Sequence, residues 1–469
     1  MSRTKIKFGT SGWRAILAED FTFANAARVV DSIILYLRST GKDKLGVAVG
    51  SDARFLGKEF RERTAKQLAE AGINVYCTER DCPTPVLSFT VRHLGLGGVI
   101  NYTASHNPAE YQGLKFSVEH GEGAGTEVTK FIEEHIDVPV EKAKTKGTIT
   151  MLDPRVPYFE ELSKLVDLEA IKKAKLSVAC DVLYGTGRGY LDEMLLKAGV
   201  KVEILHNFIN PSFGGRRPEP AAENMPELID LVKQGPFALG LGTDGDADRF
   251  GIVDGDGTFY NANQVLCLVS WHLAKNRGLK GTIVRSVATT GYLDRLARYL
   301  GAPLAEVPVG FKYIAPYVLE GKVLLGGEES GGLTIGAHIP EKDGILACLL
   351  VTELVAVSGK SLGETWKEIE AAIGTVYTGR KDLFLTPEDK ERVLAAVAAE
   401  DGDTFLGRKI VSKNRLDGHK FNFENDEWVL VRPSGTEPII RCYVESRTKE
   451  GGEALTAALS SYTDKIIKG

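Results

Sequence analysis

The chain has 469 residues, of which 43% are hydrophobic and 26% charged, a composition typical of a soluble globular protein with several domains. Lysine and arginine total 58 against 63 aspartate and glutamate, so the net charge of −5 gives no general attraction for nucleic acid. No segment is long and apolar enough to span a membrane, and the opening residues lack the apolar run of a signal peptide. These features exclude nucleic-acid-binding and membrane proteins and leave a monomer and a homodimer both open.

The cysteines also indicate where the protein resides. None of the six belongs to a C-x-x-C pair, so neither a disulfide framework nor a zinc site is expected. They are scattered along the chain, at positions 77, 82, 180, 267, 348 and 442. A reducing, cytoplasmic location fits this use of cysteine best. The apolar segment 345–357 is interpreted as a buried helix, because it is too short for a membrane span.

In chain order, short β-branched runs alternate with helical patterns, which predicts an α/β fold. The first elements are a helix at 31–37, a strand at 45–49, a helix at 59–71 and a strand at 74–77. A charged, threonine-rich stretch at 140–150 interrupts the pattern, which resumes with a strand at 176–180. We therefore place a first domain at residues 1–150.

The second half contains two further changes of pattern. The turn Asp254-Gly255-Asp256-Gly257 predicts a hairpin that closes a second domain at 151–258. A helix at 264–275 and a strand at 282–287 open a third domain, which ends after a helix at 361–372, near residue 374. Strands at 428–431 and 439–445 indicate a smaller α+β domain at 375–469. The similar lengths of the first three units hint at duplicated modules.

The first chemical motif is TASHNP at residues 103–108. It follows a predicted strand at 98–101, so Ser105 lies on a loop at the carboxyl end of a strand, where open α/β sheets bind ligands. The alternative is an Asn-Pro turn that the serine merely caps. Lys115 lies close downstream and could donate or accept a proton if its surroundings lower its pKa.

The second motif, DGDADR at residues 244–249, follows an apolar segment at 237–242. Three carboxylates at alternate positions of a tight loop need a cation or a proton between them, and hard oxygen ligands suit Mg²⁺. An EF-hand is excluded, because its sixth position would be Arg249 instead of glycine. A phosphatase of the haloacid dehalogenase type would carry threonine or valine in place of Asp248. The similar Asp254 and Asp256 are interpreted as hairpin residues.

Two further loops carry polar groups. Residues 326–332 (GGEESGG) combine glycines with carboxylate and hydroxyl groups, which suits hydrogen bonds to sugar hydroxyls at close backbone approach. Residues 432–438 (RPSGTEP), followed by Arg441, combine two guanidinium groups with hydroxyls and backbone N–H groups around a glycine. Such a set can bind an unreactive phosphate. Taken alone, either loop could be an ordinary polar turn.

In this order and spacing, the four motifs resemble the α-D-phosphohexomutase family, the phosphoglucomutases and phosphomannomutases. Residues 8–14 (FGTSGWR) are similar to the opening motif of that family, and residues 51–54 (SDAR) to its early Asp-x-Arg element. The resemblance spans almost the whole chain. It implies an α/β fold of three similar mixed α/β/α sandwich domains and a smaller C-terminal α+β domain around a central cleft, with one loop from each domain.

The resemblance also implies a function: interconversion of hexose 1-phosphate and hexose 6-phosphate through phospho-Ser105. Glucose 1,6-bisphosphate would be the intermediate and the activator. Mg²⁺ would be held by Asp244, Asp246, Asp248 and an oxygen of the phosphorylated Ser105. The implied catalytic residues are Ser105, His106, Lys115, Arg14 and Arg249, with Lys115 the first choice as general acid or base. The implied substrate-binding residues are Lys312, Glu328, Ser330, His338, Arg432, Ser434, Gly435, Thr436 and Arg441.

Sugar preference is read from residues 310–312, 328–330 and 338–344, which look more like those of phosphoglucomutases. Dual-specificity members of the family usually carry methionine at position 329 and histidine at 332, and glucosamine phosphate mutases carry glutamine at 329. Here the residues are Glu329 and Gly332, which favours glucose phosphate and keeps mannose phosphate as an alternative. The rival functions are a sugar phosphatase or bisphosphate synthase that uses the same serine and metal, and a non-catalytic sugar-phosphate sensor. A sensor would have little reason to retain Ser105 and the three aspartates.

Overall fold

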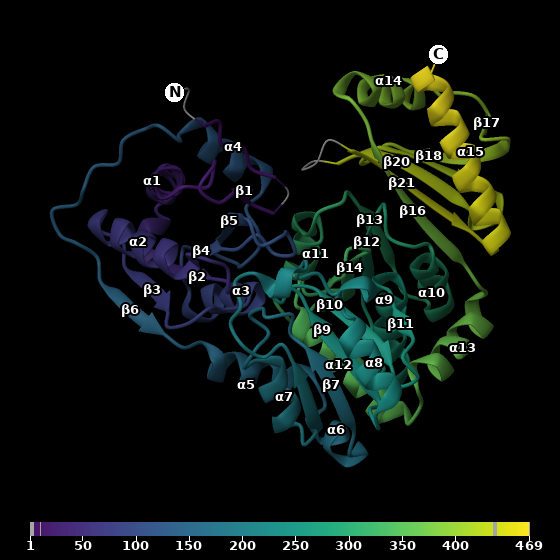
Figure 1. Ribbon diagram of the computed structural model, residues 1–469, viewed down its shortest axis with the longest axis horizontal. Coiled ribbons are helices and arrows are strands. Elements are labelled where there is room, and N and C mark those ends of the chain that lie inside the picture. The colour runs from purple at the N-terminus through teal and green to yellow at the C-terminus, as the bar shows by residue number, and fades with distance from the viewer. Residues whose placement is uncertain (1–3, 10, 435–438, 469) are drawn as a thin grey trace.

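The computed structural model describes residues 4–9, 11–434 and 439–468. Within these residues the strands form four separate sheets that follow one another along the chain (Figure 1), so the predicted α/β class is confirmed. In Figure 1 the first unit lies at the left and the fourth at the upper right, with the second and third between them.

The first sheet has the strand order β1-β5-β4-β2-β3-β6. Its elements are β1 (Trp13–Ile16), α1 (Phe23–Ser39), β2 (Val47–Ser51), α2 (Gly57–Glu70), β3 (Val75–Thr78), α3 (Thr84–Leu94), β4 (Gly98–Tyr102), β5 (Tyr111–Val118), α4 (Thr126–Glu134) and β6 (Ile149–Leu152). The second sheet has the order β11-β10-β9-β7-β8. Its elements are α5 (Arg155–Leu165), α6 (Leu168–Ala174), β7 (Ser177–Asp181), α7 (Leu191–Lys197), β8 (Lys201–Leu205), α8 (Pro226–Gln234), β9 (Leu239–Thr243), β10 (Phe250–Asp254) and β11 (Phe259–Tyr260).

The third sheet has the order β13-β12-β14-β15. Its elements are α9 (Ala262–Trp271), β12 (Thr282–Ser286), α10 (Tyr292–Leu300), β13 (Leu304–Val307), α11 (Ala315–Leu319), β14 (Val323–Glu328), β15 (Gly332–Thr334), α12 (Gly344–Ser358) and α13 (Leu362–Ile373). The fourth sheet has the order β16-β21-β20-β19-β18-β17. Its elements are β16 (Tyr377–Phe384), α14 (Pro387–Ala398), β17 (Thr404–Phe405), β18 (Arg408–Asn414), β19 (His419–Phe423), β20 (Trp428–Pro433), β21 (Ile439–Ser446) and α15 (Lys449–Lys468).

The first three sheets share one topology. In each, three parallel strands are followed in the chain by an antiparallel strand that pairs with the third: β2, β3, β4 and then β5; β7, β8, β9 and then β10; β12, β13, β14 and then β15. The spatial order of these four strands is the same each time. The hint of duplicated modules in the sequence is therefore confirmed as three similar α/β domains.

Alternation along the central strands explains why helices cover both faces of a sheet. In β2, Val47 and Val49 pack into the cluster that contains α1 and α2, whereas Ala48 faces the cluster that contains α3. Because successive side chains of a strand point to opposite faces, a strand that is apolar throughout must be covered on both sides. The result is the α/β/α sandwich that the family resemblance implied.

The fourth sheet is antiparallel throughout the strands that the structure describes, and its two helices, α14 and α15, join one apolar cluster with it. The other face of β20 and β21 contributes Trp428, Leu430 and Tyr443 to a cluster with Val287 and Ala288 of the third domain. This contact places the hairpin of the fourth domain beside the third sheet.

Two edge strands run past the domain boundaries that the sequence suggested. The first sheet includes β6, which ends at Leu152 instead of near 150, and the second includes β11, which ends at Tyr260 instead of 258. β6 has four residues that are mostly exposed, and β11 has only two, so both are short runs that give a weak strand signal in sequence.

The predicted buried helix at 345–357 corresponds to α12, which is buried along most of its length. In the described part of the chain, no helix is by itself long and apolar enough to cross a membrane; α12 and α13 meet that criterion only as a pair bent by 84°. The cysteines, all of them within the described residues, are free and buried.

Candidate active site

Ser105 lies in the loop between β4 and β5, and its backbone has a positive φ of 52°. Non-glycine residues rarely adopt this conformation, and it persists where surrounding contacts impose it. Here the Ser105 N–H donates to Thr103 Oγ1 at 2.8 Å, and Arg54 donates to the carbonyls of Ser105 at 2.7 Å and Asn107 at 2.6 Å. Arg54 is buried and paired with Asp52 at 3.1 Å. The early SDAR element therefore holds the serine loop in place.

The three aspartates of the second motif lie in the corresponding loop of the second domain, between β9 and β10. Asp244, Asp246 and Asp248 are buried, and one carboxylate oxygen from each lies within 4.8 Å of the others. No described residue donates a hydrogen bond to Asp246 Oδ1 or Asp248 Oδ1, although both are buried. Unsatisfied, clustered carboxylate oxygens suit a hard divalent cation such as Mg²⁺. The residues present therefore fit the metal that the sequence indicated.

The serine and aspartate loops meet. Ser105 Oγ donates to Asp244 Oδ2 at 2.9 Å, across two domains. The approach requires a glycine: a Cβ atom at Gly245 would lie 2.7 Å from the Ser105 carbonyl oxygen, closer than atoms pack. Ala247, with a φ of 55°, completes the tight turn. The nucleophile and the metal ligands predicted from two distant motifs thus form one site.

Lysines enter this site from two domains. Lys115 Nζ lies 2.6 Å from Asp246 Oδ2 and 3.0 Å from Asp248 Oδ2, and Lys342 Nζ lies 3.3 Å from Asp248 Oδ2. Burial would raise the pKa of Asp248, but Lys115, Lys342 and Arg249 outweigh it and hold that pKa well below its ordinary range. Lys342 was not among the predicted site residues; it belongs to the segment 338–344, which bears on sugar preference in the sequence, and the fold brings it to the aspartates.

For Lys115 the expected pKa shift was wrong in direction. Burial favours the neutral amine, but the charges of Asp246 and Asp248 outweigh burial and raise the pKa of Lys115 above its ordinary value. A role as proton acceptor, which the sequence left open, required surroundings that lower this pKa. As the structure stands, Lys115 is an ammonium group that can donate a proton and is poorly suited to accept one.

Three other predicted catalytic residues surround the serine. His106 Nδ1 lies 3.3 Å from Ser105 Oγ, and Arg14 donates to Asn107 Oδ1 at 2.6 Å in the same loop. The Arg249 N–H donates to Asp244 Oδ1 at 3.0 Å. Burial, with the charges of Arg249 and Arg14, holds the pKa of His106 well below its ordinary value, so its imidazole is neutral.

The sugar loop follows β14. Glu328 Oε1 accepts from the Gly310 N–H at 2.6 Å, and Ser330 is exposed. Glu329 accepts from Ser286 Oγ at 3.0 Å and also contacts Tyr443 of the fourth domain at 3.4 Å. This loop occupies the same topological position in the third domain as the serine and aspartate loops do in theirs. Lys312, the neighbour of this loop, donates to Thr126 of the first domain at 3.1 Å.

Glu328 gives the protein a measurable pH dependence. Burial, with the neighbouring charge of Glu329, raises the pKa of Glu328 from 4.5 to about 7. Between these values the folded protein retains a proton that the unfolded chain releases. Stability should therefore fall as the pH rises from about 4.5 to about 7, by on the order of 3 kcal/mol, and not fall further on this account above pH 7.

Glu328→Gln should remove this contribution, since glutamine retains an acceptor for the Gly310 N–H. We expect the unfolding temperature of the variant, measured by calorimetry at pH 5 and pH 8, to drop by several degrees less than that of the wild-type chain. Glu320→Gln, at an exposed position of the same domain, is the matched control and should behave as wild type. Equal drops for wild type and Glu328→Gln would contradict the prediction.

His338 is 3% exposed, and its Nε2 contacts Asp343 Oδ2 at 2.7 Å. Asp343 also accepts from Tyr158 at 2.7 Å and caps α12 through the Leu346 N–H. These contacts place His338 in a buried polar network at the start of α12. Its predicted contact with substrate stays a prediction.

The predicted phosphate loop joins β20 and β21. Arg432 and Arg441 are directly opposite each other in the ladder, an arrangement of like charges that a bound anion would stabilise. Arg432 contacts Asp417 at 2.9 Å, and the buried Ser434 donates its N–H to the Ile439 carbonyl at 2.9 Å. The predicted ligands Gly435 and Thr436 lie outside the described residues.

Comparison with known proteins accounts for this arrangement. Sequence profiles of phosphoglucomutase/phosphomannomutase match in order: α/β/α domain I over residues 5–142, domain II over 156–257, domain III over 261–372 and the C-terminal domain over 364–460. Four such domains in this order, with a serine loop beside an acidic loop that fits a divalent cation, are the architecture of a family of phosphoryl-transferring enzymes. The chain belongs to the phosphoglucomutase/phosphomannomutase family. It is a phosphohexomutase, an intramolecular phosphotransferase.

Its relatives differ in the sugar that their names specify. A phosphoglucomutase/phosphomannomutase of Thermococcus kodakarensis is 32% identical, and the match covers 98% of this chain and 99% of the relative. A probable phosphoglucosamine mutase of Methanothermobacter thermautotrophicus is 30% identical, with 98% of each chain covered. The crystal structure of a putative phosphomannomutase from Thermus thermophilus is 35% identical, with a TM-score of 0.85 and complete coverage of both chains.

Proposed function

We propose that this phosphohexomutase interconverts glucose 1-phosphate and glucose 6-phosphate in the cytoplasm, and accepts mannose phosphates less well. The reaction proceeds through phospho-Ser105 and glucose 1,6-bisphosphate. The observation that carries the proposal is the 2.9 Å contact between Ser105 Oγ and Asp244 Oδ2, beside carboxylates that fit a divalent cation. A phosphoryl group on this hydroxyl would lie beside the carboxylates that we propose as metal ligands.

The two half-reactions balance without any further reactant. In the first, a sugar hydroxyl attacks the phosphorus and gives its proton to a base, while the bond from phosphorus to Ser105 Oγ breaks and Ser105 Oγ takes up a proton from an acid. In the second, Ser105 Oγ gives up that proton and attacks the other phosphoryl group of the reoriented bisphosphate, and the released sugar oxygen takes up a proton. Mg²⁺ held by Asp244, Asp246 and Asp248 would neutralise charge on the group in transfer.

The residues around the serine have distinct proposed roles. The neutral imidazole of His106, 3.3 Å from Ser105 Oγ, is placed to accept a proton, and the Lys115 ammonium to donate one. Arg14 and Arg249 are placed beside the serine loop and the metal loop, where their guanidinium groups can orient phosphoryl oxygens. Arg432, Ser434, Gly435, Thr436 and Arg441 are proposed to hold the phosphate that does not react.

The sugar is proposed to lie against Glu328 and Ser330, with Lys312 and His338 nearby. Glu328 is fixed by the Gly310 N–H, so its second carboxylate oxygen can accept from a sugar hydroxyl. Glu329 accepts hydrogen bonds from the hydroxyls of Ser286 and Thr289, at 3.0 and 3.3 Å. A single carboxylate oxygen of Glu328 beside the Ser330 hydroxyl suits hydrogen bonds to a hexose without a charged substituent.

A second candidate, glucosamine phosphate, is favoured by one observation. Two adjacent carboxylates, Glu328 and Glu329, give the sugar loop a negative charge that would attract the ammonium group of a 2-amino sugar. Several relatives are named as probable phosphoglucosamine mutases. We place it second because the Glu329 side chain binds protein hydroxyls and is therefore not oriented toward a ligand.

A substrate panel tests the proposal. Purified protein with Mg²⁺ and a trace of the matching 1,6-bisphosphate is given the 1-phosphates of glucose, mannose or glucosamine, and formation of 6-phosphate and of free phosphate is followed. We expect kcat/KM for glucose 1-phosphate to exceed the other two by about tenfold, a difference of one good hydrogen bond. The largest kcat/KM on glucosamine 1-phosphate would overturn the sugar assignment. Free phosphate as the main product would overturn the mutase mechanism in favour of hydrolysis.

A further inference from the structure

The metal loop is held by contacts from three domains. Four consecutive carbonyls of the loop accept backbone hydrogen bonds: Asp244 from Ala247, Gly245 from Thr186, Asp246 from Thr84, and Ala247 from Gly344, at 2.9 to 3.1 Å. Two of these donors lie outside the second domain, at the first residues of α3 and α12. The position of the metal ligands therefore depends on how the first and third domains dock against the second.

Among these donors, Thr84 also reaches a metal ligand with its side chain. Thr84 Oγ1 donates to Asp246 Oδ2 at 2.5 Å, and Lys115 Nζ lies 2.6 Å from the same oxygen. Thr84 is 5% exposed, and Asn101 donates to its Oγ1 at 2.9 Å, which directs the hydroxyl hydrogen toward the aspartate. Thr84 and Lys115 thus both donate to Oδ2 of Asp246, whereas Oδ1 has no donor among the described residues.

We infer that Thr84 is a positioning residue of the metal site: its hydroxyl fixes the Asp246 carboxylate so that Oδ1 faces the cation. The inference rests on the proposed function in so far as Asp246 is taken as a metal ligand. Hydrogen bonds to the far oxygen of a ligating carboxylate restrict its rotation and tune its affinity for metal. A threonine of the phosphoserine domain thus orients a ligand of the metal-binding domain.

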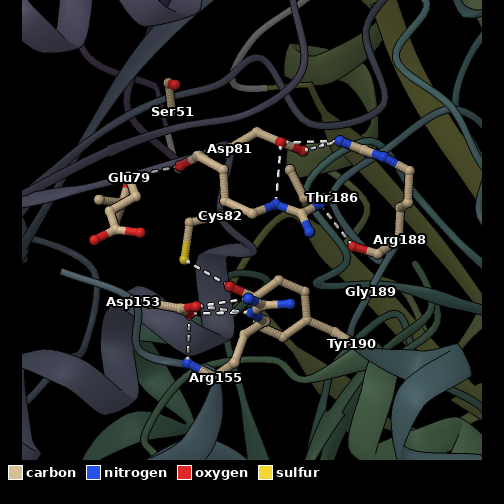
Figure 2. Close-up of polar contacts among 12 residues, drawn as sticks. Ser51, Glu79, Asp81, Cys82, Asp153, Arg155, Thr186, Arg188, Gly189 and Tyr190 are labelled. Carbon is tan, nitrogen blue, oxygen red and sulfur yellow. Dashed lines mark hydrogen bonds and ion pairs between the residues drawn. The ribbon is translucent and has the colours of Figure 1, made fainter.

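The segment that carries Thr84 is itself anchored across the same interface (Figure 2). Arg188 Nη2 contacts Asp81 Oδ1 at 2.9 Å and Oδ2 at 2.8 Å, and both side chains are about nine-tenths buried. The Cys82 thiol faces the Tyr190 hydroxyl at 3.6 Å. Arg188 follows Thr186, whose N–H holds the Gly245 carbonyl of the metal loop. Contacts between residues 81–82 and 188–190 therefore join the segment that carries Thr84 to the segment that binds the metal loop.

The experiment measures metal binding without catalysis. The full-length protein, free of substrate, is titrated with Mn²⁺, and free Mn²⁺ is followed by electron paramagnetic resonance. We expect Thr84→Val, which keeps the side-chain shape and removes the hydroxyl, to weaken Mn²⁺ binding about tenfold. Thr84→Ser restores a hydroxyl and should bind within about twofold of wild type. If Thr84→Val fails to fold, Thr84→Ala replaces it with the same expectation.

Thr90→Val is the matched control. Thr90 lies on the same helix, is 2% exposed, and donates its hydroxyl to the Val86 carbonyl at 2.7 Å, within the helix. It should bind Mn²⁺ as wild type does, which separates loss of the contact with Asp246 from general damage to α3. Wild-type affinity in Thr84→Val, or equal weakening in Thr84→Ser or Thr90→Val, would overturn the inference.

The outcome is separable from that of the proposed function. Unchanged Mn²⁺ affinity in Thr84→Val together with mutase activity in the wild type removes the positioning role alone. Weakened Mn²⁺ binding in the variant together with no mutase activity in the wild type removes the proposed reaction and leaves the positioning role standing.

Discussion

Ser105→Ala should lose mutase turnover by about 10⁴-fold or more, because no other group can carry the phosphoryl group between the two half-reactions. The rate is measured with glucose 1-phosphate, Mg²⁺ and a trace of glucose 1,6-bisphosphate. Binding of glucose 6-phosphate, measured by calorimetry, should stay within about threefold of wild type, because the proposed sugar and phosphate loops belong to other domains.

Mass spectrometry adds a check on the same residue. The peptide that bears Ser105 should carry about 80 daltons of added mass in the active wild-type enzyme and none in the variant. Ser117→Ala, at a buried position on β5 of the same domain, is the matched control and should keep both turnover and the modification. Substantial turnover in Ser105→Ala would defeat the covalent mechanism.

Asp248→Asn should have the second largest effect, and it should lower both turnover and stability. Turnover should fall by about 10³-fold or more, since one charged ligand of the cation is lost, and added Mg²⁺ should not restore it. Stability should also fall, by on the order of 3 kcal/mol, because Lys115 and Lys342 are left buried with less opposing charge. The two are measured by the coupled assay and by thermal unfolding.

Asp256→Asn provides the comparison. Asp256 belongs to a loop of similar sequence, but it lies in the turn between β10 and β11, where it accepts the Thr258 N–H at 2.8 Å. This variant should retain turnover and its response to Mg²⁺. The Asp248 prediction fails if Asp248→Asn keeps wild-type turnover.

Treatment with a chelator should reproduce the activity loss in the wild type, and Mg²⁺ should reverse it.

The serine and the aspartates that we propose as nucleophile and metal ligands could be found from sequence, because each belongs to a short motif after a strand. Ser105 and Asp244 both follow apolar strands, and loops at the carboxyl ends of strands converge on ligands in such sheets. The structure places them 2.9 Å apart. The local pattern was sufficient to locate the two loops at the ends of strands. The family resemblance was needed to predict that they lie in one site.

Residues that act through tertiary contact could not be found in this way. Thr84 and Lys342 reach the aspartates from other domains, and their sequence neighbours show no motif that points to a metal. In the sequence, Arg54 is identified only as part of a family element. The structure shows that it donates hydrogen bonds to the carbonyls of the serine loop. The pKa of Lys115 also depends on two carboxylates far away in sequence, which is why its direction was misjudged.

In each of the first three domains, the connection that carries chemistry joins the same two strands, the third parallel strand and its antiparallel partner: β4 to β5, β9 to β10 and β14 to β15. A hairpin end of this kind can change its residues while the sheet behind it keeps its shape. With the roles proposed above, one architectural unit, used three times, would serve separately to carry the phosphoryl group, to bind the cation and to bind the sugar.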